Sequence, residues 1–289
     1  MKWAKVLVLA LVSCTGGGPD RGAPDAGSST YARLAITLTT AREGNVTIGT
    51  SARLLRYRGI DVESAQVLAG SPAAAREPVG AAAGACSVID DEALLDDALA
   101  TSPPDAAVQM LDAGELLFHV AGQTVKIAPR YVPDIVPFVS GVVYDAELST
   151  PADAPFLDAE PAGNEAYIAA FGGQHIGRFL APAEVPSAPR ITAVTGGRDT
   201  DLALTWVPEL ARGQVQVVLA GEYGPAVRCI VPDVGHFVIP AALTGRVGEA
   251  VRGEPLTLAL ERSRRTPFSA PGLEAAEVDV VLRDVAVVR

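Results

Sequence analysis

The chain has 289 residues, of which 49% are hydrophobic, and a mean hydropathy of +0.27. This is enough apolar material for one large or two ordinary domains with buried cores, and two domains are the better expectation. The formal net charge of −11 at pH 7 repels the phosphates of nucleic acids and the head groups of anionic lipids. We therefore expect no nucleic-acid partner, and any attachment to a membrane has to come from something other than a basic surface.

The first thirteen residues have the three-part plan of a secretory signal peptide. Lys2 and Lys5 give a cationic start, an apolar run of valine, leucine and alanine follows, and a serine precedes Cys14. The apolar run is much shorter than the about 20 residues that a membrane-spanning helix needs. Residues 1–13 are therefore predicted to be removed on export, which takes away two lysines and no acid and changes the net charge from −11 to −13.

The residues Leu11-Val12-Ser13-Cys14 resemble the lipobox of bacterial lipoproteins, with a branched apolar residue three positions before a cysteine and a small residue directly before it. The resemblance implies cleavage before Cys14 and a diacylglycerol on its sulfur, usually with a third, amide-linked acyl chain such as palmitate. Two or three acyl chains give durable attachment, whereas one chain is marginal. Thr15, in place of an aspartate after the cysteine, implies the outer membrane of a Gram-negative bacterium. The alternatives are an ordinary signal peptide with a chance cysteine, or a misassigned start.

Residues 14–29 are predicted to be the lipidated cysteine and a flexible tether. The segment after the cysteine is rich in glycine, proline and serine and has no apolar periodicity. A Gly-rich coil of this length reaches roughly 20 Å, enough to lift a folded body clear of the lipid head groups. The body begins near Tyr31, and residues 30–180 are predicted to form an N-terminal β-rich domain.

Short apolar runs between glycine and proline turns predict the strands of this domain. The expected strands are residues 31–40, 51–57, 61–68, 113–120, 123–128, 136–144 and 166–171. The stretch 71–85 is rich in alanine, glycine and proline and is expected to be a surface connection. Residues 90–99 begin with acids and contain spaced leucines, which predicts an amphipathic helix that ends before Pro103-Pro104.

Three prolines within residues 181–189 predict a Pro-rich linker between two domains. The following residues, 190–289, contain seven candidate strands at the spacing typical of a β-sandwich. These strands are residues 191–194, 201–207, 214–220, 227–231, 236–239, 255–261 and 277–288. The predicted fold is therefore mainly β, with two β-rich domains of which the C-terminal one is an immunoglobulin-like β-sandwich.

Pro189-Arg-Ile191, followed by the segment Asp201-Leu-Ala-Leu-Thr-Trp206-Val-Pro208, resembles the first two strands of fibronectin type III and related immunoglobulin-like domains. In that family a buried tryptophan anchors the core, which implies a core position for Trp206. Leu202, Leu204 and Trp206 share one face of the strand by its period of two. The chain has no clear tyrosine-corner residue before the penultimate strand, so the exact topology stays open.

A second resemblance rests on Cys86, Asp112-Ala113-Gly114, Ile168 to Gly173, Phe179, Trp206 to Pro208, Cys229 to Gly235 and Ile239-Pro240. With these residues the layout is similar to an uncharacterised type of lipoprotein found in large-genome Gram-negative bacteria. This resemblance implies no particular activity.

Once Cys14 is reserved for lipid, Cys86 and Cys229 remain as an even pair in an exported protein. Disulfides persist in the periplasm and on cell surfaces, so we predict a bridge between these two residues. Because it closes a long loop, the chain-entropy model gives it about 4 to 5 kcal/mol of stabilisation. The alternative is two separate buried thiols.

The sequence contains no Gly-x-Ser-x-Gly elbow, His-Glu-x-x-His pair, P-loop or dinucleotide-binding fingerprint. His119, His175 and His236 lie in separate segments without an acid at ligand spacing, and we interpret them as turn or rim residues. The acidic run 90–97 lacks the alternating oxygens and the glycine of an EF-hand loop and is interpreted as a solvated helix face. No catalytic residue, metal or cofactor is therefore predicted.

Three further features have ordinary structural interpretations. Residues 172–177, which contain three glycines, are interpreted as a hairpin. Arg262, Arg264 and Arg265 form a local basic patch, interpreted as a strand-end hairpin, with a contact site for an acidic partner or lipopolysaccharide as the alternative. Only 5% of residues are aromatic and Trp3 leaves with the signal peptide, which disfavours a platform that stacks sugars on aromatic rings.

The expected function is that of a lipid-anchored cell-envelope protein with a non-catalytic binding or structural role. Its expected partners are the membrane, through the lipid anchor, and other envelope proteins, while a small-molecule ligand is left open. The alternative is an envelope hydrolase or accessory factor whose active site lies on loops of the N-terminal domain.

Overall fold

The computed structural model describes residues 27–40, 46–71, 84–120, 122–132, 139–150, 166–209, 213–250 and 255–288. In these residues the chain is mainly β, as predicted, with seventeen strands and three helices. The predicted signal peptide, Cys14 and all but the last residues of the predicted tether lie outside the described residues. Within the described part, no helix has the length and apolar character needed to cross a membrane.

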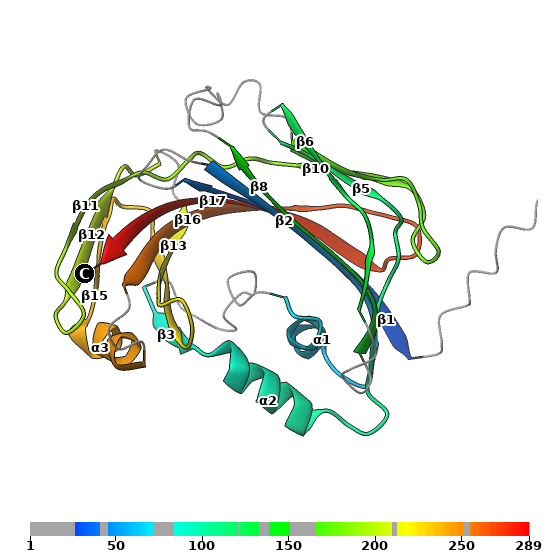
Figure 1. The fold of residues 1–289 in the computed structure, drawn as a ribbon, viewed down its shortest axis with the longest axis horizontal. Coiled ribbons are helices and arrows are strands. Elements are labelled where there is room, and N and C mark those ends of the chain that lie inside the picture. Colours follow the sequence, from blue (N-terminus) through cyan, green and yellow to red (C-terminus); the bar gives the residue numbers. More distant parts are fainter. Residues whose placement is uncertain are drawn as a thin grey trace, which may run out of the picture.

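Ten strands form one long sheet that Figure 1 shows as an arch. Across this sheet the order is β3 (Cys86–Ile89), β14 (Ala226–Pro232), β13 (Gln214–Ala220), β16 (Leu256–Pro267), β17 (Ala275–Val288), β1 (Ser28–Thr40), β2 (Val46–Arg58), β4 (Ala107–Met110), β8 (Val139–Thr150) and β7 (Arg130–Val132). A four-stranded sheet has the order β10 (Phe179–Ala183), β9 (Ala166–Ala170), β5 (Leu116–Val120) and β6 (Gln123–Ile127). A three-stranded sheet has the order β11 (Ile191–Thr195), β12 (Leu202–Trp206) and β15 (His236–Ile239). The helices are α1 (Val62–Leu68) and α2 (Asp91–Thr101), which lie beneath the arch, and α3 (Ala241–Ala250) (Figure 1).

The long sheet crosses the domain boundary that the sequence predicts at residues 181–189. β1 pairs in parallel with β17, from Tyr31 opposite Ala275 to Thr40 opposite Asp284. β3 likewise pairs with β14. The two predicted halves therefore share one sheet, and the prediction of two separate β-rich domains is corrected. The predicted linker is itself partly a strand, since β10 runs through Pro182 at an edge, where a missing N–H is tolerated.

Alternation along the strands gives the long sheet two different faces. Even-numbered residues of β1, β16 and β17 lie on what we call the apolar face, and odd-numbered residues of these strands lie on the polar face. The apolar face carries two hydrophobic cores. In the first, Leu34 and Val280 pack with Phe118 of the four-stranded sheet. In the second, Leu258 packs with Leu204 of the three-stranded sheet, so the C-terminal strands form a two-layered sandwich.

Arg262 lies on the apolar face at the junction of the two cores. Its neighbour on β16, Leu260, belongs to the second core, and its cross-strand partner Leu282 belongs to the first. The guanidinium forms an ion pair with Asp233 at 2.9 Å, and both side chains are almost fully buried, with 4% and 1% exposure. Trp206, the predicted core residue, donates from its indole nitrogen to the same carboxylate at 2.6 Å.

The remaining donors of Arg262 bind the segment that precedes β11 and the residue that follows β12. Nη2 donates to the carbonyl oxygen of Val207 at 2.7 Å, and Nη1 donates to Ser187 Oγ at 3.0 Å and to the carbonyl of Ala188 at 3.2 Å. Burial raises the pKa of the Asp233 carboxyl, but the hydrogen bonds from Arg262 and Trp206 outweigh burial and hold its pKa below 3.8. The stability that this carboxylate contributes is complete above pH 3.8 and is lost as the pH falls through its lowered pKa.

Three local differences from the sequence prediction have physical causes. Residues 61–68, predicted as a strand, form α1, because Asp61 caps the helix by accepting from the N–H of Ser64 at 2.7 Å. Its apolar residues follow a spacing of three rather than two, and Leu68 packs beneath Leu55 of β2. Helix α3 was not predicted, although Val247 belongs to the second core. β16 and β17 are longer than predicted.

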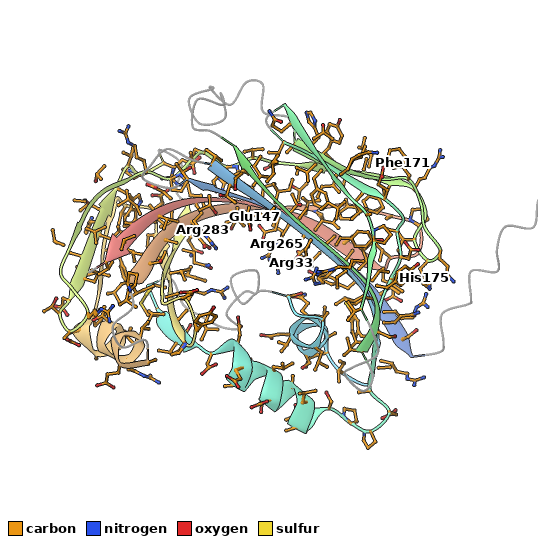
Figure 2. All side chains as sticks on the ribbon, viewed as in Figure 1. Arg33, Glu147, Phe171, His175, Arg265 and Arg283 are labelled. Carbon is orange, nitrogen blue, oxygen red and sulfur yellow. A yellow bond between two sulfur atoms is a disulfide. The ribbon has the colours of Figure 1, made fainter. Side chains whose placement is uncertain are left out.

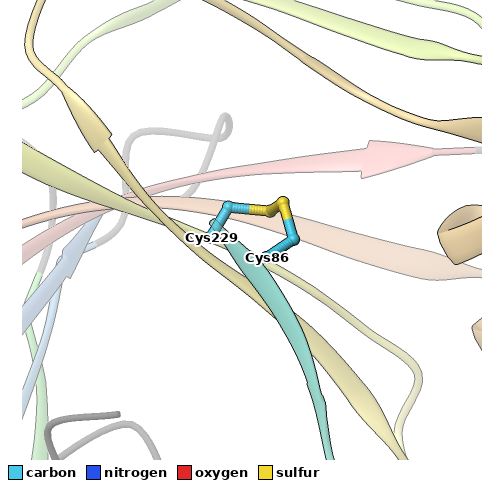
Figure 3. Close-up of a disulfide and its surroundings, with 2 residues drawn as sticks. All are labelled: Cys86 and Cys229. Atoms are coloured by element: carbon cyan, nitrogen blue, oxygen red, sulfur yellow. A yellow bond between two sulfur atoms is a disulfide. The ribbon is translucent and has the colours of Figure 1, made fainter. Parts of the chain in front are cut away.

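The predicted disulfide between Cys86 and Cys229 is confirmed (Figure 3), with sulfurs 2.03 Å apart. The two residues stand opposite each other in the β3–β14 pair, so the bridge fixes an edge strand of the long sheet. Residues 84–106, which we call the strap, then run beneath the arch to β4, near its other edge (Figure 1).

Helix α2, in the middle of the strap, confirms the helix predicted at residues 90–99. The Asp90 side chain caps it by accepting from the N–H groups of Glu92 and Ala93. Ala98 is its one buried residue, at 6% exposure, whereas its leucines are 36 to 40% exposed. The ends of the strap therefore provide most of its attachment to the sheet, and Ala98 adds a contact to the core that contains Leu55 and Leu68.

Replacing Arg262 by methionine leaves the Asp233 carboxylate buried without its cation. We expect the Arg262→Met variant to lose about 3 to 5 kcal/mol of unfolding free energy in urea titrations followed by circular dichroism. The double variant Arg262→Met, Asp233→Asn should regain much of this loss, because it removes the uncompensated charge.

Arg264→Met is the matched control, because Arg264 lies on the same strand but is 38% exposed and pairs with Glu209 at 3.4 Å. Its loss should stay below about 1 kcal/mol. Equal losses for Arg262→Met and Arg264→Met would contradict the role given to the buried ion pair.

Candidate functional site

A first set of paired charges lies on the polar face, where β1, β17 and β16 run side by side. Arg33 donates from Nη2 to Asp279 Oδ2 at 2.6 Å, and its Nη1 lies 3.7 Å from Glu277 Oε1. Arg265 faces the same carboxylates, 3.5 Å from Glu277 and 4.0 Å from Asp279. The Tyr31 hydroxyl donates to Glu277, and burial together with this bond raises the pKa of Tyr31, which stays protonated as a donor.

A second set of paired charges lies further along β17. Arg283 contacts Glu261 Oε1 as an ion pair, and Gln216 Nε2 donates to Glu261 Oε2 at 2.7 Å. Arg283 and Asp279 are four residues apart on one strand, so the two sets lie about 13 Å apart. Glu261 is 3% exposed, and Arg33 and Asp279 of the first set are 6% and 3% exposed. Glu261, Arg33 and Asp279 are therefore buried charges on the face opposite the first two cores, whereas the side chains of Arg265 and Arg283 are 32% and 29% exposed.

These buried charges keep unused hydrogen-bonding groups. Among the described residues, the atoms of this kind on the polar face are Nε of Arg33, Oδ1 of Asp279, Nε of Arg283 and Oε1 of Glu261. The last meets Arg283 as an ion pair but not in hydrogen-bond geometry. These atoms are buried from solvent, so a ligand on the polar face does not reach them, and the candidate site has to be sought among groups that are accessible on this face.

A hollow of about 380 Å³ opens on the polar face where β1, β2 and β8 lie side by side. Its lining includes the side chains of Thr37, Ser51, Asp145 and Glu147. Gly49 leaves the space free, because a Cβ at this position would meet only Thr37, at 3.9 Å. Asp145 is held by Arg53 at 3.0 Å, whereas Glu147 is exposed.

Strand register places the hollow next to both sets of charges. Thr37 is paired with Val281 of β17, and Asp279 and Arg283 lie two residues to either side of Val281. Figure 2 shows Arg33, Arg265, Arg283 and Glu147 over the middle of the arch, with Arg33 and Arg265 directed towards the space beneath it. The two charge sets and the hollow thus lie on the same face of the long sheet, and the hollow with its polar lining is the candidate functional site.

The three histidines lie apart from this surface and from one another. His119 on β5 contacts Thr124 at 2.9 Å and stacks on Tyr167, with ring centroids 4.7 Å apart. His236 is exposed on β15. His175 lies in the loop between β9 and β10, at the side of the molecule in Figure 2, and its Nδ1 accepts from the N–H of Asp112 at 3.1 Å.

The Asp112 carboxylate does not bind His175, as the carboxylate that orients a catalytic histidine would. Its Oδ1 accepts from the N–H of Gly114 at 2.7 Å and from the Tyr144 hydroxyl at 3.2 Å. The segment 172–177, predicted as a hairpin, packs closely on this loop, since a Cβ on Gly173 would lie 2.2 Å from the Gly114 nitrogen. These residues, which carry part of the second family resemblance, therefore hold two loops together.

The three arginines of the predicted basic patch do not form one surface. Arg262 points into the protein and Arg264 pairs with Glu209, while Arg265 lies on the opposite, polar face. The acidic run 90–97 lies on the exposed sides of α2, and no group of three metal-binding side chains occurs within the described residues.

The polar face was not predicted from the sequence, although a signal was present. Glu277, Asp279 and Arg283 occupy alternate positions of an otherwise apolar strand, which places charges on one face of a strand whose other face is core. The partner of Asp279, Arg33, lies 246 positions away in the chain. Only the parallel pairing of β1 with β17 brings them together.

Comparison with known proteins gives no family for the chain: no family model matches it, and no curated protein sequence matches it. Among solved structures, a yeast delta-COP-I mu-homology domain in complex with a Dsl1 WxWxV peptide is similar with 10% sequence identity and a TM-score of 0.26. The alignment covers 89% of this chain and 96% of that one. This TM-score is below the range expected for two proteins that share a fold.

The environment of His175 predicts its titration. Burial, and then the positive charge of Arg56, lower the pKa of His175 below 6.5. Its neutral form contributes stability that is complete above pH 6.5 and is lost as the pH falls through the lowered pKa. In an NMR titration we expect the His175 midpoint below 6.5, and Arg56→Gln should move it upwards. A midpoint above 6.5 in the unmodified protein would contradict the hydrogen bond from Asp112.

Proposed function

We propose that this chain is a lipid-anchored protein of the bacterial cell envelope, and that its folded body binds a polar ligand on the polar face without catalysing a reaction. The binding part rests on one observation, the hollow of about 380 Å³ on the polar face, whose lining includes Thr37, Ser51, Asp145 and Glu147. This volume is within the usual range of small-ligand sites, and the polar lining suits a polar occupant.

Binding is proposed rather than catalysis because of how the groups on the face are engaged. Within the described residues, Arg33 and Arg283 are each held by a carboxylate, and Tyr31 is held by Glu277. Such mutually fixed charges form a rigid surface that orients a ligand by hydrogen bonds. Charges that are engaged with one another in this way suit recognition rather than proton transfer.

The anchoring part rests on the sequence around Cys14. A cationic start, a short apolar run and the Leu11-Val12-Ser13-Cys14 motif support export, cleavage and lipidation. The disulfide between Cys86 and Cys229 supports an oxidising compartment such as the periplasm. A tether of roughly 20 Å between Cys14 and β1 would keep the arch close to the outer membrane while leaving the polar face free to turn.

Metabolic labelling tests the anchor. Cells that express the protein and grow with labelled palmitate should incorporate the label into it, and Cys14→Ala should abolish incorporation, because the acyl chains are attached at that residue. Ser13→Ala, which keeps a small residue before the cysteine, is the control and should leave labelling intact. Label that persists in Cys14→Ala would refute the lipoprotein assignment.

Recovery of a bound ligand tests the binding part. The full protein, purified in detergent after incubation with envelope extract, should release a small polar molecule on heat denaturation, detected by mass spectrometry. The amount should approach one molecule per chain and should not change with longer incubation. Progressive conversion of that molecule to a product would contradict binding without catalysis, and recovery of nothing above an unrelated lipoprotein treated in the same way would contradict binding itself.

A further inference from the structure

We propose that the outer surface of the four-stranded sheet, formed by the outward side chains of β9, β10 and β5, contacts the lipid membrane to which the chain is anchored. This inference goes beyond ligand binding and rests on the proposed lipid anchor. It follows from three properties of the outer surface: its apolar composition, its position beside the first strand and the charges at its rim.

The outer surface is apolar where a polar one is expected. The four-stranded sheet forms the outer layer of the molecule (Figure 1), and Ile168 of β9 and Ala181 of β10 point inwards to the first core. By alternation, the residues on either side of these two point outwards. Along β9 and β10 the outward residues are Tyr167, Ala169, Phe171, Arg178, Leu180 and Pro182. An antiparallel sheet normally carries polar residues on its solvent side, so this apolar surface indicates contact with a partner.

The apolar residues form one patch across three strands. Leu180, which is 65% exposed, is paired with Ala169, and Ala169 is paired in turn with Leu117 of β5. In the next row of the sheet, Tyr167 stacks on His119, with ring centroids 4.7 Å apart. The exposed apolar residues are therefore neighbours on one flat surface, as an extended partner such as a lipid surface requires.

The chain enters the folded body beside the outer surface. Near the start of β1, Thr30 Oγ1 accepts from the N–H of Glu274 at 3.0 Å. Three residues before Glu274, the carbonyl of Pro271 accepts at 3.1 Å from the N–H of Gly177, in the loop that leads into β10. Phe171, at the other end of this loop, lies on the side of the molecule where β1 begins (Figures 1 and 2). The predicted tether of roughly 20 Å thus joins the lipid to the side of the body that carries the apolar patch.

The rim of the patch carries groups that suit lipid head groups. Arg178 is exposed, its Nε donates to the carbonyl of Phe171 at 3.1 Å, and it forms no ion pair within the described residues. A guanidinium binds phosphate groups well, and tyrosine, here Tyr167, is enriched at membrane–water interfaces. Lys126, at the opposite rim, is compensated by Glu115 at 2.9 Å. Because the net charge of −11 repels anionic lipids, a zwitterionic phospholipid fits this surface best.

Contact through the outer surface would set the direction of the hollow. The four-stranded sheet packs on the apolar face of the long sheet, whereas the hollow opens on the polar face. With the outer surface on the lipid, the hollow faces away from the membrane. The tether alone would leave the body free to turn, so the contact adds an orientation that the anchor does not provide.

Fluorescence of a label on the outer surface tests the contact. The full lipidated protein carries Leu180→Cys, labelled with the environment-sensitive fluorophore NBD, and is reconstituted into phosphatidylcholine vesicles that contain nitroxide-labelled lipid. Because Cys14 is acylated and Cys86 and Cys229 are bridged, the introduced cysteine supplies the free thiol. The emission at position 180 should shift to the blue and be quenched by the nitroxide lipid. Val238→Cys, 47% exposed on the three-stranded sheet, is the matched control, and its label should show neither effect.

A substitution beside the label tests the apolar patch itself. Phe171 is 49% exposed, and Phe171→Ser removes apolar area from the contact, so quenching of the label at position 180 should fall by about half or more. Val287→Ser, at a residue that is 53% exposed on the polar face, should leave the quenching unchanged.

Contrary results separate the contact from the anchor. Protein that floats with the vesicles in a density gradient but shows no quenching at position 180, or equal quenching at positions 180 and 238, would refute the contact and leave the anchor intact. Protein that does not float with the vesicles would contradict the anchor and the inference with it. A blue shift without quenching that grows with the protein-to-lipid ratio would assign the surface to a second copy of the chain instead. If Leu180→Cys does not fold, Phe171→Cys carries the label with the same expected outcomes.

Discussion

The two hydrophobic cores meet at the buried ion pair of Arg262 and Asp233, and the arrangement of all three sheets depends on this junction. One guanidinium binds the carboxylate that also holds Trp206, and it satisfies the carbonyl groups of Val207 and Ala188. An apolar residue could fill the same volume, but it would leave these backbone acceptors unsatisfied where two cores exclude water. The pair is therefore better understood as fixing the geometry of the junction than as a large net source of stability.

This junction lets one sheet serve two cores, and the polar face is a consequence of that continuity. β17 contributes Val280 to one core and Val288 to the other, and its alternate residues place Asp279 and Arg283 on the opposite side. β1 completes the face from the other end of the chain by its parallel pairing with β17. Two independent domains would each have had an open edge at this point, whereas the shared sheet buries Arg33 between neighbouring strands.

The sequence predicted what depends on local pattern and missed what depends on distant pairing. Alternation identified most strands, the acidic start of residues 90–99 identified α2, and the parity of the cysteines identified the bridge. A short run with spacing of three was mistaken for a strand at 61–68, because seven residues give too few periods to separate the two patterns. Arg262 and Arg265 looked like one basic patch, since their positions on opposite faces are evident only once the strand is known to continue. The polar face depends on contacts across almost the whole chain, which no local pattern encodes.

The strap runs beneath the arch and joins its two sides across an interior that is polar in its middle and apolar near β4. The two larger hydrophobic cores lie on the outer side of the arch, and a third, which contains Leu55, Met110 and Leu68 of α1, lies beneath it. The disulfide at Cys86 and Cys229 fixes one end of the strap at an edge strand, and β4 fixes the other end beside β2. Ala98 is the one buried residue of α2, so the strap is held mainly at its two ends. In this way it connects the two sides of the arch. The disulfide at one end of the strap and the third core at the other hold the two sides of the arch in place, and this fixes the positions of the charges and the hollow between them, which is what a preorganised binding surface requires.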